Sequence, residues 1–172
     1  MIRELIASVF FTFCSPGDFS LPPDSLHLKK LDQYAISILK QVPRDRRLII
    51  KKYGKPIEIR SKRIENDYYP AQPDSSFELS YKNLSISILK ISNKNEEYIE
   101  DISFSRGFKF ISKPTFGSSL NSVQDYFGST MNHTTSDLKY CIMSEEITPY
   151  YSLYFQFDSN GLCSIDLEIG NP

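Results

Sequence analysis

Apolar residues recur at helical spacing in the part of the chain that follows residue 23. The positions are Leu28, Leu31, Tyr34, Ala35, Ile38, Leu39 and Val42. This spacing predicts an amphipathic helix, with Asp24 or Ser25 as its N-cap. A second, shorter helix is predicted from Arg44 to Tyr53, because Pro43 suits a first helical turn. Gly54 suits the left-handed residue that ends a helix.

After Pro56 the pattern changes to an alternation of apolar and polar residues. The apolar members of the successive runs are Ile57 and Ile59; Phe77, Leu79 and Tyr81; Leu84, Ile86 and Ile88; and Ile102 and Phe104. Alternation with period two predicts strands that bury one face and leave the other polar. The first half of the chain therefore predicts helices followed by four strands.

The same order returns from residue 117. Gly117-Ser118-Ser119 offers an N-cap, and a stripe of Leu120, Val123 and Phe127 predicts a helix that ends at Gly128. When Gly128 is aligned on Gly54, Val123 falls on Ile49 and Phe127 falls on Tyr53. Alternating runs follow at 138–142, 151–157 and 163–169. The last two are joined by Asp158-Ser159-Asn160-Gly161, a strong hairpin signal because Asn-Gly accepts positive φ angles.

These patterns predict an α+β protein made of two tandem repeats. Each repeat is a helix followed by a four-stranded antiparallel meander, with the helices on one face of the sheet. The predicted division is an N-terminal apolar segment and linker at 1–23, a first repeat at 24–112 and a second repeat at 113–172. Chance similarity between two amphipathic stretches is the alternative.

The segment "TFGSSLNSVQDYFGST" at 115–130 carries a family resemblance. It resembles the helix that opens each repeat of the β-lactamase-inhibitor-protein-like fold, which the small lipoprotein subunit of the outer-membrane β-barrel assembly machine shares. The resemblance covers about residues 43–170 and implies a short helical unit packed on one face of a longer curved sheet. The first copy, "VPRDRRLIIKKYGKP", lacks the Gly-Ser start, and the second has Thr130 where the motif has proline.

Charge is distributed unevenly along the 172 residues, although the net charge is only -1. Residues 44–63 contain nine Lys and Arg against Asp45 and Glu58, whereas residues 137–172 contain six acids against Lys139 alone. The near-zero total excludes a general attraction to nucleic acid. The basic segment is either a solvated helix and strand or a patch that steers a charged partner.

The first fourteen residues resemble a bacterial lipoprotein signal. An apolar run at 5–13 follows Arg3 and ends at Cys14, which would carry the lipid. Phe13 stands where a small residue is expected, and the run is too short to span a bilayer as a helix. The sequence leaves open a lipidated protein of the periplasm or envelope and a cytoplasmic protein that packs this run in its core.

The sequence contains no recognisable set of catalytic residues. Neither His27 nor His133 has a Cys, Asp or Glu at the spacing of metal ligands, and no oxyanion motif surrounds Cys141, which lies near His133 in sequence. Nucleotide-binding glycine motifs are also missing. We therefore expect no enzyme activity, no cofactor and no metal.

The remaining signal is a surface suited to contact with another protein. Tyrosine on a rigid sheet is common at such interfaces because it contributes area with few rotamers to order. The predicted partner-binding residues are Arg60, Lys62, Tyr68, Tyr69, Lys82, Tyr150, Tyr154 and Gln156. We expect a non-enzymatic module, such as an inhibitor or immunity protein, with a toxin or hydrolase as its partner. An envelope lipoprotein that acts as an assembly scaffold and a small-ligand carrier are the alternatives; a membrane contact would come only through a lipid on Cys14.

Overall fold

A computed structural model describes residues 25–66, 68–110, 112–128, 132–133, 137–142 and 151–170. This part of the chain is α+β, with three helices against one antiparallel sheet. The helices are α2 (Ser25–Gln41), α3 (Arg46–Tyr53) and α4 (Leu120–Phe127). The strands are β1 (Glu58–Ile64), β2 (Asp74–Tyr81), β3 (Leu84–Ile91), β4 (Glu96–Ser105), β5 (Asn132–His133), β6 (Asp137–Ile142), β7 (Tyr151–Asp158) and β8 (Gly161–Ile169).

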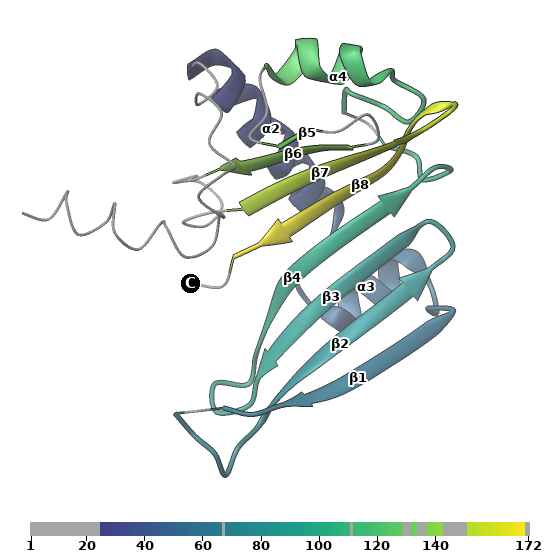
Figure 1. The fold of residues 1–172 in the computed structure, drawn as a ribbon. Coiled ribbons are helices and arrows are strands. Elements are labelled where there is room, and N and C mark those ends of the chain that lie inside the picture. Colours follow the sequence, from purple (N-terminus) through teal and green to yellow (C-terminus); the bar gives the residue numbers. More distant parts are fainter. Residues whose placement is uncertain are drawn as a thin grey trace, which may run out of the picture.

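The sheet is a single open sheet in the order β1-β2-β3-β4-β8-β7-β6-β5 (Figure 1). Strands β1–β4 form its first half and β5–β8 its second half. The halves meet where β4 pairs with β8, with Asp101 opposite Glu168 and Ser105 opposite Ser164. The alternating runs of the sequence fall on these strands, and the two-residue β5 is the strand of the second half for which no alternating run was identified.

The helix α3 begins two residues later than the sequence predicts. Asp45, rather than Pro43, decides the start: its carboxylate accepts hydrogen bonds from the backbone N–H of Arg47 at 2.7 Å and of Leu48 at 3.2 Å. An N-cap of this kind satisfies donors that have no partner inside the helix. The helix therefore runs from Arg46, and the predicted start at Arg44 is wrong.

The helix α4 and the β7–β8 hairpin follow the sequence prediction. Ser119 caps α4 by accepting from the backbone N–H of Ser122 at 3.2 Å. Gly161 has φ +90° in the hairpin turn. Its backbone lies so close to the segment before α4 that a Cβ there would meet the Gly117 carbonyl oxygen at 2.5 Å. The hairpin and α4 are thus packed together, which only glycine at position 161 allows.

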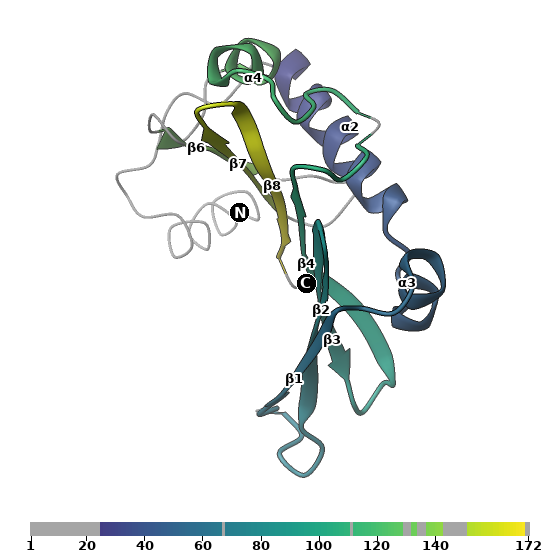
Figure 2. The ribbon, with the colours of Figure 1, turned by 90° about the vertical axis from the view of Figure 1, so that its right-hand side faces the viewer.

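All three helices lie on one face of the sheet, as Figure 2 shows in a view along the strands' edges. The helix α2 packs over the second half of the sheet, although it precedes the first half in sequence. Its Tyr34 is 3% exposed and contacts the rings of Phe127 and Phe155, with ring centroids 5.3 and 5.8 Å away. The Tyr151 hydroxyl donates to Asp32 of α2 at 2.7 Å. The same helix also contacts the first half, because the Lys52 ammonium of α3 donates to the Gln41 carbonyl at 2.6 Å.

Three parts of the sequence predictions lie outside the described residues: the N-terminal segment with Cys14, the candidate N-cap Asp24, and the partner-binding candidate Tyr150. Within the described residues, every helix is too short or too polar to cross a bilayer.

Candidate functional site

The face of the sheet opposite the helices carries two rows of polar side chains. Strand register aligns them across the molecule, because directly opposite residues of paired strands share a face. One row is Arg60, Glu78, Ser87, Asp101, Glu168 and Ser152; the other is Glu58, Ser80, Ser85, Ser103, Asp166, Tyr154 and Lys139. No described helix covers these rows. We call this surface the open face.

The centre of the open face is acidic. Asp101 and Glu168 lie opposite each other at the β4–β8 junction, with Asp166 opposite Ser103 in the adjacent row. Ser103 donates to Asp101 at 3.3 Å, and Ser164 donates to both carboxylate oxygens of Asp166 at 3.3 Å. We call Asp101, Asp166 and Glu168 the acidic cluster.

Burial raises the pKa of two members of this cluster, Asp101 and Asp166. Burial raises the pKa of Asp101 to about 6, and the neighbouring Asp166 and Glu168 carboxylates add to the effect. Burial also raises the pKa of Asp166, although its serine hydrogen bonds oppose the shift. A half-buried negative cluster is costly for the isolated protein and is relieved by a bound positive charge. The cluster can therefore accept Lys or Arg side chains.

Tyr154 borders the acidic cluster on β7. Its hydroxyl donates to Glu168 at 3.1 Å, and the Lys139 ammonium lies 5.0 Å from its ring centroid. Burial raises the pKa of Tyr154. The ring is thus held in place on the open face, with Gln156 exposed farther along the same strand.

The basic segment 44–63 does not form one surface. Its first six cations precede β1, on α3 and its flanking turns, on the helix side of the sheet, whereas Arg60 and Lys62 of β1 point toward the open face. Arg46 makes contacts within the protein: its guanidinium lies 3.9 Å from the Phe77 ring centroid and 3.5 Å from the Glu97 carboxylate. Arg60 pairs with Glu58 at 2.9 Å. The positive charge of the segment is therefore divided between two faces.

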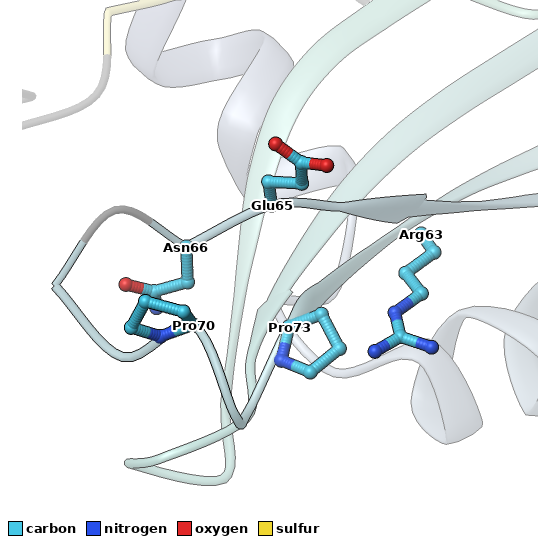
Figure 3. Close-up of a pocket in the computed structure, with 5 residues that line it drawn as sticks. All are labelled: Arg63, Glu65, Asn66, Pro70 and Pro73. Atoms are coloured by element: carbon cyan, nitrogen blue, oxygen red, sulfur yellow. The ribbon is translucent and has the colours of Figure 1, made fainter.

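The β1–β2 loop extends beyond the rest of the sheet (Figure 1) and presents two tyrosines. Tyr68 is 90% exposed and Tyr69 is 52% exposed. Asn66 organises the loop, because its side-chain oxygen accepts from the backbone N–H of both tyrosines at 3.0 Å. A hollow of about 540 Å³ lies beside this loop (Figure 3). Its lining residues are Arg63, Glu65, Asn66, Pro70 and Pro73.

The structure brings together only some of the predicted partner-binding residues. Arg60 and Lys62 share one face of β1, and the loop with Tyr68 and Tyr69 follows directly. Lys82 lies in the β2–β3 turn, at the opposite end of β1 from that loop. Tyr154 and Gln156 are on β7, five strands from β1 in the sheet order. Tyr150 lies outside the described residues.

The acidic cluster is the feature that the predicted site omitted. The alternation in "EDISFS" and "SIDLEI" does place its members on a polar strand face. Their proximity follows from the pairing of β4 with β8, which neither sequence pattern specifies. Among the described residues, no three His, Cys, Asp or Glu side chains are grouped as a metal site requires.

Comparison with protein-family models, with curated proteins and with solved structures returned no match for this chain. The resemblance of residues 115–130 to the inhibitor fold therefore stays a prediction from the sequence.

Proposed function

We propose that this protein is a non-enzymatic binding module that covers a partner protein with its open face. The observation that carries the proposal is the one-sidedness of the sheet: the described helices are on one face, and the other presents small polar, acidic and tyrosine side chains. The serine side chains of this face are short, so a partner can approach the backbone of the sheet closely. An inhibitor or immunity protein is the class that such a surface fits best.

The charge of the open face specifies the partner further. Asp101, Asp166 and Glu168 lie at its centre, so the partner presents Lys or Arg side chains there. A positive charge bound between the three carboxylates attracts each of them and offsets their mutual repulsion. This attraction supports both affinity and fast association. Binding through the acidic cluster weakens as ionic strength rises.

We also propose that the chain contains two copies of one helix–glycine–meander unit. Three similarities support this. Gly54 and Gly128 follow α3 and α4 with nearly the same backbone angles, φ 84° and ψ -168° against φ 81° and ψ -165°. Ile49 and Val123 are fully buried at matching helical positions. Four antiparallel strands come after each glycine. In this interpretation α2 is an addition to the doubled unit.

The test is an affinity capture from native cell extract with quantitative mass spectrometry. Ser85→Arg adds a long cation to the open face, and Ser122→Arg makes the same change on the exposed side of α4. We expect a protein partner that wild type and Ser122→Arg recover equally and that Ser85→Arg loses. If all three recover the same proteins in the same amounts, the open face is not the binding surface.

A further inference from the structure

The first strand of the sheet has an outer edge that no described strand occupies. β1 pairs with β2 on one side and stands at the end of the strand order. An edge strand presents unpaired backbone N–H and C=O groups, which are a template for pairing with another extended chain. The opposite end of the sheet differs, because β5 contains only two residues. β1 therefore offers the longer of the two edges.

Side chains on both faces of β1 are available to a partner. Ile59 is 52% exposed and Ile57, just before the strand, is 76% exposed. Lys62 points toward the open face and Arg63 toward the helix side. Neither cation has an acceptor among the described residues. The edge thus combines uncovered aliphatic groups with unpaired positive charges.

A second copy of the chain is a poor occupant of this edge. Antiparallel self-pairing over the whole strand is centred on Ser61, and it sets Arg60 of one copy opposite Lys62 of the other. Like charges directly opposite each other destabilise a strand pair. The same register sets Ile59 opposite Arg63, so that the aliphatic group gains no apolar neighbour. An acidic strand satisfies all of these positions better.

We propose that the β1 edge is a strand-addition site for an extended acidic segment of another protein. The added strand runs antiparallel to β1, with acidic residues opposite Lys62 and Arg63 and an aliphatic residue opposite Ile59. Main-chain hydrogen bonds supply affinity in this mode of recognition, and the alternate side chains supply specificity. The site goes beyond the proposed function, because it uses the sheet edge and not the open face.

The test uses the full chain and a fluorescein-labelled peptide, Glu-Glu-Thr-Glu-Val-Thr-Val, which matches Arg63 to Ile57 in antiparallel register. We expect saturable binding by fluorescence anisotropy at low salt. The double variant Lys62→Glu/Arg63→Glu should weaken binding at least about tenfold, since two attractive charge pairs become repulsive. Lys51→Glu is the control, because it changes an exposed cation on α3. Backbone amide NMR shifts should be concentrated in β1 and β2.

A second peptide separates strand addition from simple charge attraction. Replacing both threonines by proline keeps every charge and removes two backbone N–H groups. Successive N–H groups along a strand point to opposite sides, and the two threonines differ in parity. Whichever set of alternate N–H groups faces β1, one of the two lost donors therefore belongs to that set. We expect this peptide to bind at least about tenfold more weakly.

Several outcomes overturn the proposal: no binding of the first peptide, equal binding of the proline peptide, equal weakening by Lys51→Glu, or amide shifts away from β1. A peptide-free dimer in sedimentation that Ile59→Lys disrupts would assign the edge to a second copy instead, because the substitution adds a like charge opposite Arg63 in the self-paired register. Ser85→Arg should bind the peptide as wild type does, so failure here is distinguishable from failure of the open-face proposal.

Discussion

The two halves of the sheet differ in how well their helices cover them. In the second half β7 buries Tyr151, Leu153 and Phe155 completely under α2 and α4. In the first half the eight-residue α3 is the described cover, and β1 is exposed along almost its whole length. The difference lies at the outer strand, because the inner strand β3 of the first half buries Leu84, Ile86 and Ile88. The first half therefore has exposed strand surface that is available for contacts with a partner. In the second half, the apolar face of β7 is buried under helices and contributes to stability.

The most damaging change should be the loss of the α2 anchor. Tyr34→Ala removes a buried ring, with its hydroxyl bond to the Pro114 carbonyl at 2.9 Å, and should cost about 3–5 kcal/mol of unfolding free energy. Tyr53→Ala on α3 removes a half-buried ring that packs on Tyr81 and Phe108. It should cost roughly half as much. Urea denaturation measures both. Equal costs would mean that α2 is not the dominant cover.

The two glycine caps offer a finer comparison. Gly54 and Gly128 have φ near +80°, where alanine is strained by about 1–3 kcal/mol. A Cβ at Gly54 has no neighbour within 4 Å, but at Gly128 it meets the His27 ring at 2.7 Å. Gly128→Ala should therefore be more destabilising than Gly54→Ala by about 1 kcal/mol.

A double-mutant cycle tests the cause of that excess. In combination with His27→Ala, Gly128→Ala should lose the extra cost, because the obstructing ring of α2 is gone. Gly54→Ala should show no coupling to His27→Ala. If the excess persists in the double variant, contact with α2 does not explain it.

The junction between the halves should show a pH dependence of smaller size. The pKa of Asp101 is about 6 in the folded protein against an ordinary 3.8. The folded state thus holds this proton more tightly, so stability falls as pH rises from about 4 to about 6. Asp101→Asn should stabilise the protein on the order of 1 kcal/mol near pH 7.5 and have no effect near pH 4.

Asp158→Asn is the matched control of opposite sign. The hydrogen bond from Arg106 lowers the pKa of Asp158, so its ionised form favours folding. The asparagine variant should destabilise at neutral pH, with the effect fading as the pH falls through the Asp158 pKa. Urea titrations across this range distinguish the two. A loss of stability in Asp101→Asn at neutral pH would contradict the strain assigned to the acidic cluster.

Most local structure could be predicted from the sequence. Alternation fixed which side chains of β3 and β7 are buried, because only a period of two keeps one strand face apolar. Ser119 and Asn160-Gly161 marked a helix start and a hairpin by chemistry that acts within a few residues. The start of α3 was misplaced because proline and aspartate both favour helix starts, and the aspartate carboxylate prevailed.

Long-range placement could not be predicted in the same way. The periodicity of α2 identifies its buried stripe but not the half of the sheet that the stripe covers. The cations of residues 44–63 form one block in sequence, yet a helix and an alternating strand divide them between two faces. The acidic cluster depends on the pairing of β4 with β8, whose residues are far apart in the chain. The Ser164 hydroxyl oxygen, for example, lies 3.2 Å from the carbonyl oxygen of Phe104, a residue 60 positions away.

That pairing has a consequence for synthesis on the ribosome. β8 is made after every other strand of the sheet, so β4 has an open edge for as long as the second half is still being translated. Nascent chains expose such edges to their neighbours on the same messenger RNA. Translation that stalls before β8 would leave a first half with two unprotected edges. We expect the nascent chain to depend on chaperones most strongly during this interval.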